Sequence, residues 1–196
     1  MSNQSGLAVI ISSPSGGGKT TVVDELLKRH PGWMRSISTT TRAMRVGEEN
    51  GRDYFFVNVE QFETLKKQNG LLENAQVHLN QYGTPRLFVE SQVSLGKVVF
   101  LTVDVQGAEK IKKLWHDSKS LMSVFIMPTS IDVLRERLLR RNTETLAQIE
   151  VRLSAAAQEM EQARHYDFTV YNHSLDQTVG EIEKLIVDKV EKRRSA

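Results

Sequence analysis

The stretch Ser12-Ser-Pro-Ser-Gly-Gly-Gly-Lys-Thr-Thr21 decides the fold of this chain. It follows the apolar run at residues 7–11, which is long enough for a buried strand and too short for a buried helix. After it, residues 21–29 carry their apolar side chains on one side of a predicted helix. A strand, a glycine-rich turn and a helix that opens on Lys-Thr are the context of a phosphate-binding P-loop. The stretch therefore predicts a nucleoside triphosphate site.

The chemistry of this loop follows from its residue types. Three consecutive glycines let backbone N–H groups converge without Cβ clashes, and a helix N-terminus adds partial positive charge. Lys19 would bridge the terminal phosphates, and the Thr20 hydroxyl would complete the shell of a Mg²⁺ ion. Ser13 stands where the motif expects its first glycine. The alternative interpretation is a glycine-rich surface turn after a core strand.

Composition narrows the class of protein. The 196 residues suffice for one domain with inserted lobes, and 26 basic against 24 acidic residues are too balanced for a general nucleic-acid binder. The absence of cysteine excludes disulfides, thiolate metal sites and thiol nucleophiles. Without an apolar signal region or a membrane-length run, we expect a cytoplasmic protein that binds neither nucleic acid nor membrane. The oligomeric state stays open, and a homo-oligomer is possible.

Strand-like and helix-like segments alternate along most of the chain, which predicts an α/β fold with a parallel sheet covered by helices. Strands are expected at residues 7–11, 98–103, 123–127 and 168–171, and further helices at 106–115, at 131–141, from Thr145 and from Ser174. Residues 36–97 break this rhythm and predict an inserted α+β lobe. We therefore expect a single domain, residues 1–196, with its core at 1–35 and 98–196. The lobe opposite the P-loop suits a second substrate.

Several charged residues are candidates for phosphate or base binding. Arg42 and Arg45 lie in a segment rich in hydroxyls and suit phosphate oxygens, although an exposed loop is an equal alternative. A second basic group at Arg135, Arg137, Arg140 and Arg141, with Arg152 beyond it, is either a solvated helix face or a source of cations for phosphoryl transfer.

Two carboxylates fall at informative places. Asp104 follows a predicted strand, where it could hold Mg²⁺, steer an arginine or cap the next helix. Glu73, in an apolar surround, could accept two hydrogen bonds from the N–H edge of guanine, or be a surface residue of a short strand. The five histidines show no metal-ligand spacing.

Taken together, these stretches resemble the guanylate kinase family over nearly the whole chain. The resemblance rests on SSPSGGGKT at 12–20, STTTRAMRVGE at 38–48, GRDYFF at 51–56, LENA at 72–75, YGT at 82–84, DVQG at 104–107 and the spacing of Arg137, Arg141 and Arg152. It implies a P-loop kinase that moves the γ-phosphoryl of MgATP onto GMP, and onto dGMP. It also implies a helical lid at about residues 137–155.

The resemblance assigns roles to matching positions. It implies that the GMP phosphate is held by Arg42, Arg45, Tyr54 and Tyr82, and that the guanine edge is read by Ser38, Glu73 and Thr84. ATP would be bound by Ser15, Gly16, Gly17, Gly18, Lys19, Thr20 and Thr21, with Asn172 near adenine. Asp104 would lie by the acceptor and reach Mg²⁺ through water, and Arg137, Arg141 and Arg152 would clamp the phosphates.

Departures from the family pattern keep other acceptors open. Thr102 replaces a usual aspartate, Met44 a usual proline, and Leu79, Gln81, Arg140 and Asn142 replace other common residues. The alternatives are a kinase of the same fold acting on another phosphorylated acceptor, such as a pentose phosphate, and a non-catalytic module that binds phosphopeptides. The intact Gly18-Lys19-Thr20 argues against the module.

Overall fold

A five-stranded parallel sheet forms the centre of the molecule. The sequence predicts the parallel sheet and four of its strands, but not the short edge strand Met34–Arg35. The computed structural model describes residues 6–14, 16–77, 79–115, 117–141 and 146–195. The strand order is β2-β7-β1-β8-β9, and each neighbouring pair is parallel. The strands are β1 (Leu7–Ser12), β2 (Met34–Arg35), β7 (Val98–Thr102), β8 (Leu121–Pro128) and β9 (Phe168–Asn172).

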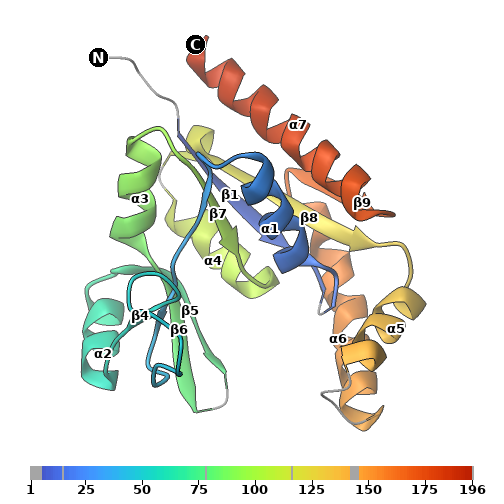
Figure 1. Cartoon of the computed structure of the whole chain (residues 1–196), viewed down its shortest axis with the longest axis horizontal. Helices are drawn as coiled ribbons and strands as arrows, with labels where there is room; N and C mark the ends of the chain where they lie inside the picture. The colour runs from blue at the N-terminus through green and yellow to red at the C-terminus, as the bar shows by residue number, and fades with distance from the viewer. Residues whose placement is uncertain (1–5, 15, 78, 116, 142–145, 196) are drawn as a thin grey trace.

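Helices cover both faces of this sheet, which explains the apolar runs of its strands (Figure 1). On one face, α1 (Lys19–Arg29) and α7 (Leu175–Arg194) bury side chains such as Leu26 and Ile182 against β1. On the other face, α3 (Arg86–Ser94) and α4 (Val105–Leu114) contribute Val89 and Ile111 to a second cluster. Every residue of β1 is buried, so the P-loop starts from a rigid strand.

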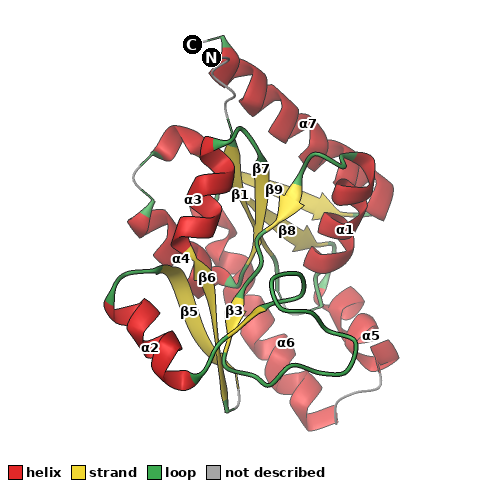
Figure 2. Cartoon of the chain, turned by 60° about the vertical axis from the view of Figure 1, so that its left-hand side comes forward, coloured by secondary structure: helices red, strands yellow, loops and turns green. Residues whose placement is uncertain are grey.

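The inserted lobe has its own four-stranded sheet, in the order β4-β3-β6-β5 (Figure 2). The strands are β3 (Thr39–Thr40), β4 (Phe55–Phe56), β5 (Leu71–Val77) and β6 (Asn80–Pro85), with α2 (Val59–Lys67) between β4 and β5. Helix α3 follows this sheet in the chain but packs on the core. Proline favours the first position of a helix, but Pro85 is instead the N-cap of α3, because its ψ of 120° is extended.

Helices α5 (Ile131–Arg141) and α6 (Leu146–Glu161) form a pair beside the core. Leu134, Leu138, Ile149, Leu153 and Ala156 make a small apolar cluster of their own. Figure 1 shows this pair and the lobe at the same end of the core sheet, on opposite sides of it. Thr145, the expected start of the second of these helices, lies outside the described residues.

The last helix begins where the sequence predicts it. Helix α7 is capped by Ser174, whose Oγ accepts from Gln177 N at 3.3 Å. Short 3₁₀ turns occupy Ser118–Ser120 and Gln162–His165. Within the described ranges, no helix is both long and apolar enough to cross a membrane, and no group of histidine and acidic side chains has the arrangement of a metal site.

Candidate active site

The loop between β1 and α1 has the backbone that phosphate binding requires. Gly16 and Gly18 have φ of 82° and 99°, a left-handed conformation that side chains disfavour. Gly18 is also the N-cap of α1, so no capping side chain occupies the first N–H groups of the helix. These groups and the helix dipole can therefore serve a bound anion. Ser15 lies outside the described residues.

Lys19 reaches back across the loop toward the end of β1. Its Nζ donates to the carbonyl oxygen of Ser13 at 2.8 Å and lies 3.4 Å from Ser13 Oγ. Ser13 is buried, and its Oγ donates to Pro14 O at 3.0 Å. The serine in place of the motif's first glycine thus packs inside the loop and contacts the lysine. Thr20 and Thr21 are exposed in the first turn of α1.

A pocket of about 460 Å³ opens beside the loop. Arg137 of α5 places Nη1 at 3.4 Å from Gly17 O, and Asn172 Nδ2 donates to the same oxygen at 2.9 Å. The pocket is lined by Gly16, Gly18, Thr21, Val22, Arg137, Arg140, Asn172, His173, Ser174 and Leu175. The P-loop, helix α5 and the β9–α7 turn therefore meet at one cavity.

In the lobe, paired strands bring the expected base-reading residues together. Glu73 on β5 is paired with Thr84 on β6, and Thr84 Oγ1 donates to Glu73 Oε1 at 2.7 Å. Ser38 directly precedes β3, whose Thr39 pairs with Gly83. Burial raises the pKa of the Glu73 carboxyl, and the charge of Asp104 raises it further, against the Thr84 hydrogen bond.

Asp104 adopts the helix-cap conformation that the sequence left as an alternative. Its Oδ1 accepts from Gly107 N at 2.7 Å, at the start of α4. The residue is exposed at the carboxyl end of β7, where ligands of parallel sheets collect. A Cβ on Gly107 would lie 3.4 Å from Asp104 Oδ1 and 3.5 Å from Glu73 Cγ. The core and the lobe thus bring two carboxylates to the same region.

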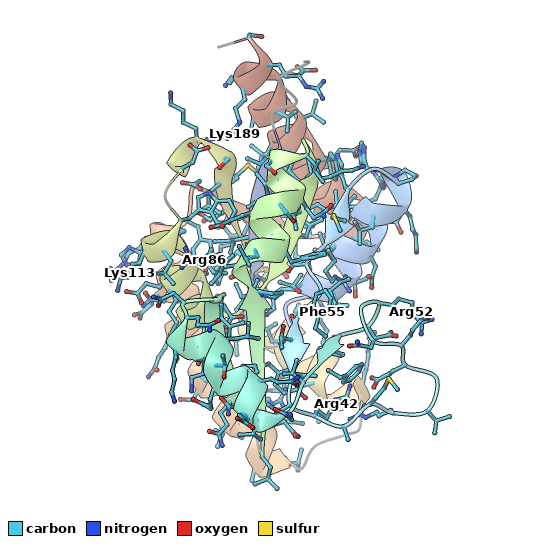
Figure 3. All side chains as sticks on the ribbon, turned by 90° about the vertical axis from the view of Figure 1, so that its left-hand side faces the viewer. Arg42, Arg52, Phe55, Arg86, Lys113 and Lys189 are labelled. Atoms are coloured by element: carbon cyan, nitrogen blue, oxygen red, sulfur yellow. The ribbon has the colours of Figure 1, made fainter. Side chains whose placement is uncertain are left out.

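Arg42 lies in an aromatic setting within the lobe. Its Cζ is 5.3 Å from the ring centroid of Tyr54, and that ring is 6.0 Å from the ring of Tyr82. Its Nη2 donates to Glu48 Oε1 at 2.6 Å, and the other Glu48 oxygen accepts from the backbone N of Arg45 at 2.7 Å. Figure 3 shows Arg42 and Arg52 in the same loop of the lobe.

Comparisons with known proteins agree with this arrangement. Residues 5–189 match the family model described as guanylate kinase. The chain belongs to the guanylate kinase family. It is 43% identical to the guanylate kinase of Wolbachia sp. subsp. Brugia malayi over 97% of this chain and 96% of that one. It is 42% identical to the guanylate kinase of Synechocystis sp. over 92% of this chain and 93% of that one.

A solved structure supports the same assignment. The crystal structure of guanylate kinase from Anaplasma phagocytophilum superposes with a TM-score of 0.70 and 33% identity, covering 95% of this chain and 87% of that one. The family assignment confirms the resemblance and the P-loop kinase fold predicted from the sequence, and it makes the chain an ATP-dependent nucleoside monophosphate kinase.

The structure brings together some of the residues to which the family resemblance assigns roles, and not others. It brings together Arg42, Tyr54 and Tyr82, and separately Glu73 and Thr84. Arg137 contacts the P-loop, whereas Arg45 and Arg152 are exposed. The side chain of Arg141 lies outside the described part of the chain.

Glu48 is a residue to which the sequence reasoning assigned no role. Arg42 lowers the pKa of the Glu48 carboxyl chiefly through a hydrogen bond, so the pair stays ionised over the neutral range. The spacing of Arg42, Arg45 and Glu48, each three residues apart, was the available signal. A glutamate three residues from one arginine and six from another, in one loop, indicates an ion pair with one of them.

Replacing Gly17 by alanine is expected to disrupt the loop, because the new methyl group would overlap the side chain of Ser13. A Cβ at Gly17 would lie 2.5 Å from Ser13 Oγ and 2.7 Å from Ser13 Cβ. Gly17→Ala should therefore weaken ATP binding about 30-fold, an overpacking cost of about 2 kcal/mol. Adding Ser13→Gly removes both atoms and leaves Pro14 O, at 3.0 Å, as the nearest of the contacts, so it should restore part of the affinity, as isothermal titration of the single and double variants would measure. Equal affinities for Gly17→Ala with and without Ser13→Gly would contradict this steric explanation.

Proposed function

We propose that this chain transfers the γ-phosphoryl group of MgATP to GMP, giving ADP and GDP. The observation that carries the proposal is Glu73, a half-buried carboxylate on β5 of the lobe, oriented by Thr84 at 2.7 Å. Guanine presents adjacent N–H and NH₂ donors to such a carboxylate, and adenine lacks this pair. Ser38 and Thr84 would add contacts to the same edge.

The phosphate of GMP would bind at the aromatic end of the lobe. Glu48 holds the guanidinium of Arg42 beside Tyr54 and Tyr82, so the cation and two phenol groups are already gathered there. A planar guanidinium suits two oxygens of a phosphate. Arg45, exposed in the same loop, would add a second cation.

The donor triphosphate would lie on the P-loop, with its base in the pocket of about 460 Å³. The loop N–H groups and Lys19 would hold the phosphates. Mg²⁺ favours oxygen ligands and keeps several waters, which fits the exposed Thr20 hydroxyl and, through water, the Asp104 oxygen that does not cap α4. The bound ion would neutralise charge on the transferring group.

Catalysis would consist of alignment and charge neutralisation. The acceptor oxygen is already anionic, so the reaction needs no strong general base. Arg137 already contacts the P-loop, and we place Arg141 and Arg152 with it in a lid at about residues 137–155. Closure of this lid and of the lobe at about 36–97 would exclude water and prevent ATP hydrolysis.

The direct test is ADP release from MgATP with a panel of acceptors: GMP, dGMP, AMP, UMP, CMP and a pentose phosphate. We expect turnover with GMP and dGMP alone. Turnover only with the pentose phosphate would move the chemistry to another acceptor. A folded chain without turnover on any of them would favour the phosphopeptide-binding module, which binding of phosphorylated peptides would then test.

The raised pKa of Glu73 predicts how GMP binding depends on pH. Glu73 takes up its proton at a higher pH than an ordinary glutamate, whose pKa is about 4.3. As the pH falls from about 8 to about 5, the KM for GMP should rise because the protonated carboxyl loses an acceptor. The KM for ATP should change less, and initial rates across this range would measure both.

A variant separates this effect from titration of the substrate. The GMP phosphate itself titrates near pH 6, by analogy with phosphorylated side chains. Glu73→Gln keeps that contribution and removes the ionisable group. The acid-side rise in the KM for GMP should therefore be smaller in Glu73→Gln, and an identical pH profile in both proteins would assign the rise to the phosphate alone.

A further inference from the structure

Asn172, the last residue of β9, has both polar ends of its side chain engaged by the protein. Its Nδ2 donates to Gly17 O at 2.9 Å, and its Oδ1 lies 3.2 Å from the hydroxyl of Thr178. The side chain is buried, with 7% of its surface exposed. A carbonyl on one side and a hydroxyl on the other leave one consistent amide orientation, with nitrogen toward Gly17.

We propose that Asn172 is a positioning residue, which holds the P-loop in place. It affects binding of the donor through this loop and not through a contact with the donor's base. This inference rests on the proposed function, in which ATP is the donor. In a trans peptide the C=O and the following N–H point in opposite directions. Holding Gly17 O toward Asn172 therefore holds the N–H of Gly18 pointing away from it. That N–H is one of the loop groups available to a phosphate.

The close packing between the loop and Asn172 supports this role. A Cβ on Gly18 would lie 3.1 Å from Asn172 Nδ2, so the glycine allows the amide to approach. Gly18 has a φ of 99°, which glycine adopts without the Cβ clash of other residues, and Asn172 bonds the peptide directly before it. Arg137 Nη1 approaches the same Gly17 oxygen at 3.4 Å, a longer contact.

Thr178 in α7 supports Asn172 from behind. Its side chain is fully buried and so does not reach a ligand in the pocket. Its single hydroxyl proton is shared between Ser174 O at 2.7 Å and Asn172 Oδ1 at 3.2 Å. The link from Thr178 to Asn172 is therefore the weaker of the two, and its loss should have the smaller effect.

Inorganic tripolyphosphate distinguishes the loop from the base, because it carries phosphates and no base. Titrations at fixed excess Mg²⁺ would measure its Kd and that of ATP. For Asn172→Ala, we expect both Kd values to rise about tenfold, the equivalent of one net hydrogen bond, while the Kd for GMP stays unchanged. Thr178→Val should shift both in the same direction by about threefold, and Thr178→Ser should restore them.

Controls make the outcome decisive. Tyr171→Phe alters the exposed neighbour of Asn172 on the same strand and should leave both Kd values unchanged. A loss of ATP affinity in Asn172→Ala with wild-type affinity for tripolyphosphate would overturn the proposal and make Asn172 a base contact. A wild-type chain that binds neither ligand would instead overturn the donor site itself. Should Asn172→Ala fail to fold, Thr178→Val carries the same comparison.

Discussion

Replacing Lys19 by alanine is expected to reduce phosphoryl transfer by about 10³-fold or more, the largest effect of any single substitution here. Lys19 provides the positive charge at the P-loop that would follow the terminal phosphates into the transition state. In the free protein its Nζ is held by Ser13 O at 2.8 Å, so it is already positioned at the loop. No other side chain of α1 points back across the loop in this way among the described contacts.

The test compares kcat for Lys19→Ala with kcat for Lys28→Ala. Lys28 lies on the same helix, is exposed and pairs with Glu25 at 3.2 Å. Its replacement should leave kcat unchanged. Circular dichroism should show that both variants are folded, since a single net hydrogen bond contributes only about 1 kcal/mol. Near-normal turnover in Lys19→Ala would remove the P-loop from the mechanism.

Replacing Glu73 by glutamine is expected to raise the KM for GMP about 100-fold while the KM for ATP changes less than about twofold. Glutamine keeps the size of the side chain and one acceptor, which still suits the hydroxyl of Thr84. It replaces the second acceptor with an NH₂ group, which would face the donors of guanine. The variant thereby loses one hydrogen bond to guanine, and its NH₂ group is brought against a hydrogen-bond donor of the base.

The same substitution should not destabilise the free protein. Burial raises the pKa of Glu73, so ionisation of this carboxyl is disfavoured in the folded chain and costs stability at neutral pH. Glutamine removes that cost, and the melting temperature of Glu73→Gln should equal or exceed that of the wild type. Glu60→Gln, in the exposed first turn of α2, is the matched control and should change neither KM. An equal rise in both KM values for Glu73→Gln would remove this residue from base recognition.

The core of the fold was predictable because its signals are local. The uninterrupted apolar run of β1 and the Lys-Thr start of α1 mark a buried strand and a phosphate-binding helix within one segment. The short strands of the lobe were harder to predict. β3 and β4 contain two residues each, so they show no periodicity, and their pairing with neighbours depends on contacts distant in sequence.

The site was predictable in its residue types but not in its contacts. From the sequence alone, Asp104 fits both a helix cap and a ligand of Mg²⁺. The structure shows that one of its carboxylate oxygens caps α4. The pairing of Arg42 with Glu48 depends on a loop conformation that spacing alone does not determine. The engagement of Asn172 by Gly17 joins residues 155 positions apart, which no local pattern reports.

The most direct measurement is to follow the γ-phosphoryl group itself, by incubating the wild-type chain with γ-labelled ATP, Mg²⁺ and GMP and separating the products. We predict that the label appears in GDP. Lys19→Ala should abolish this transfer, and AMP in place of GMP should not accept the label. Label released as inorganic phosphate, or transferred equally well to AMP, would contradict the proposal that this site aligns MgATP with a guanine nucleotide.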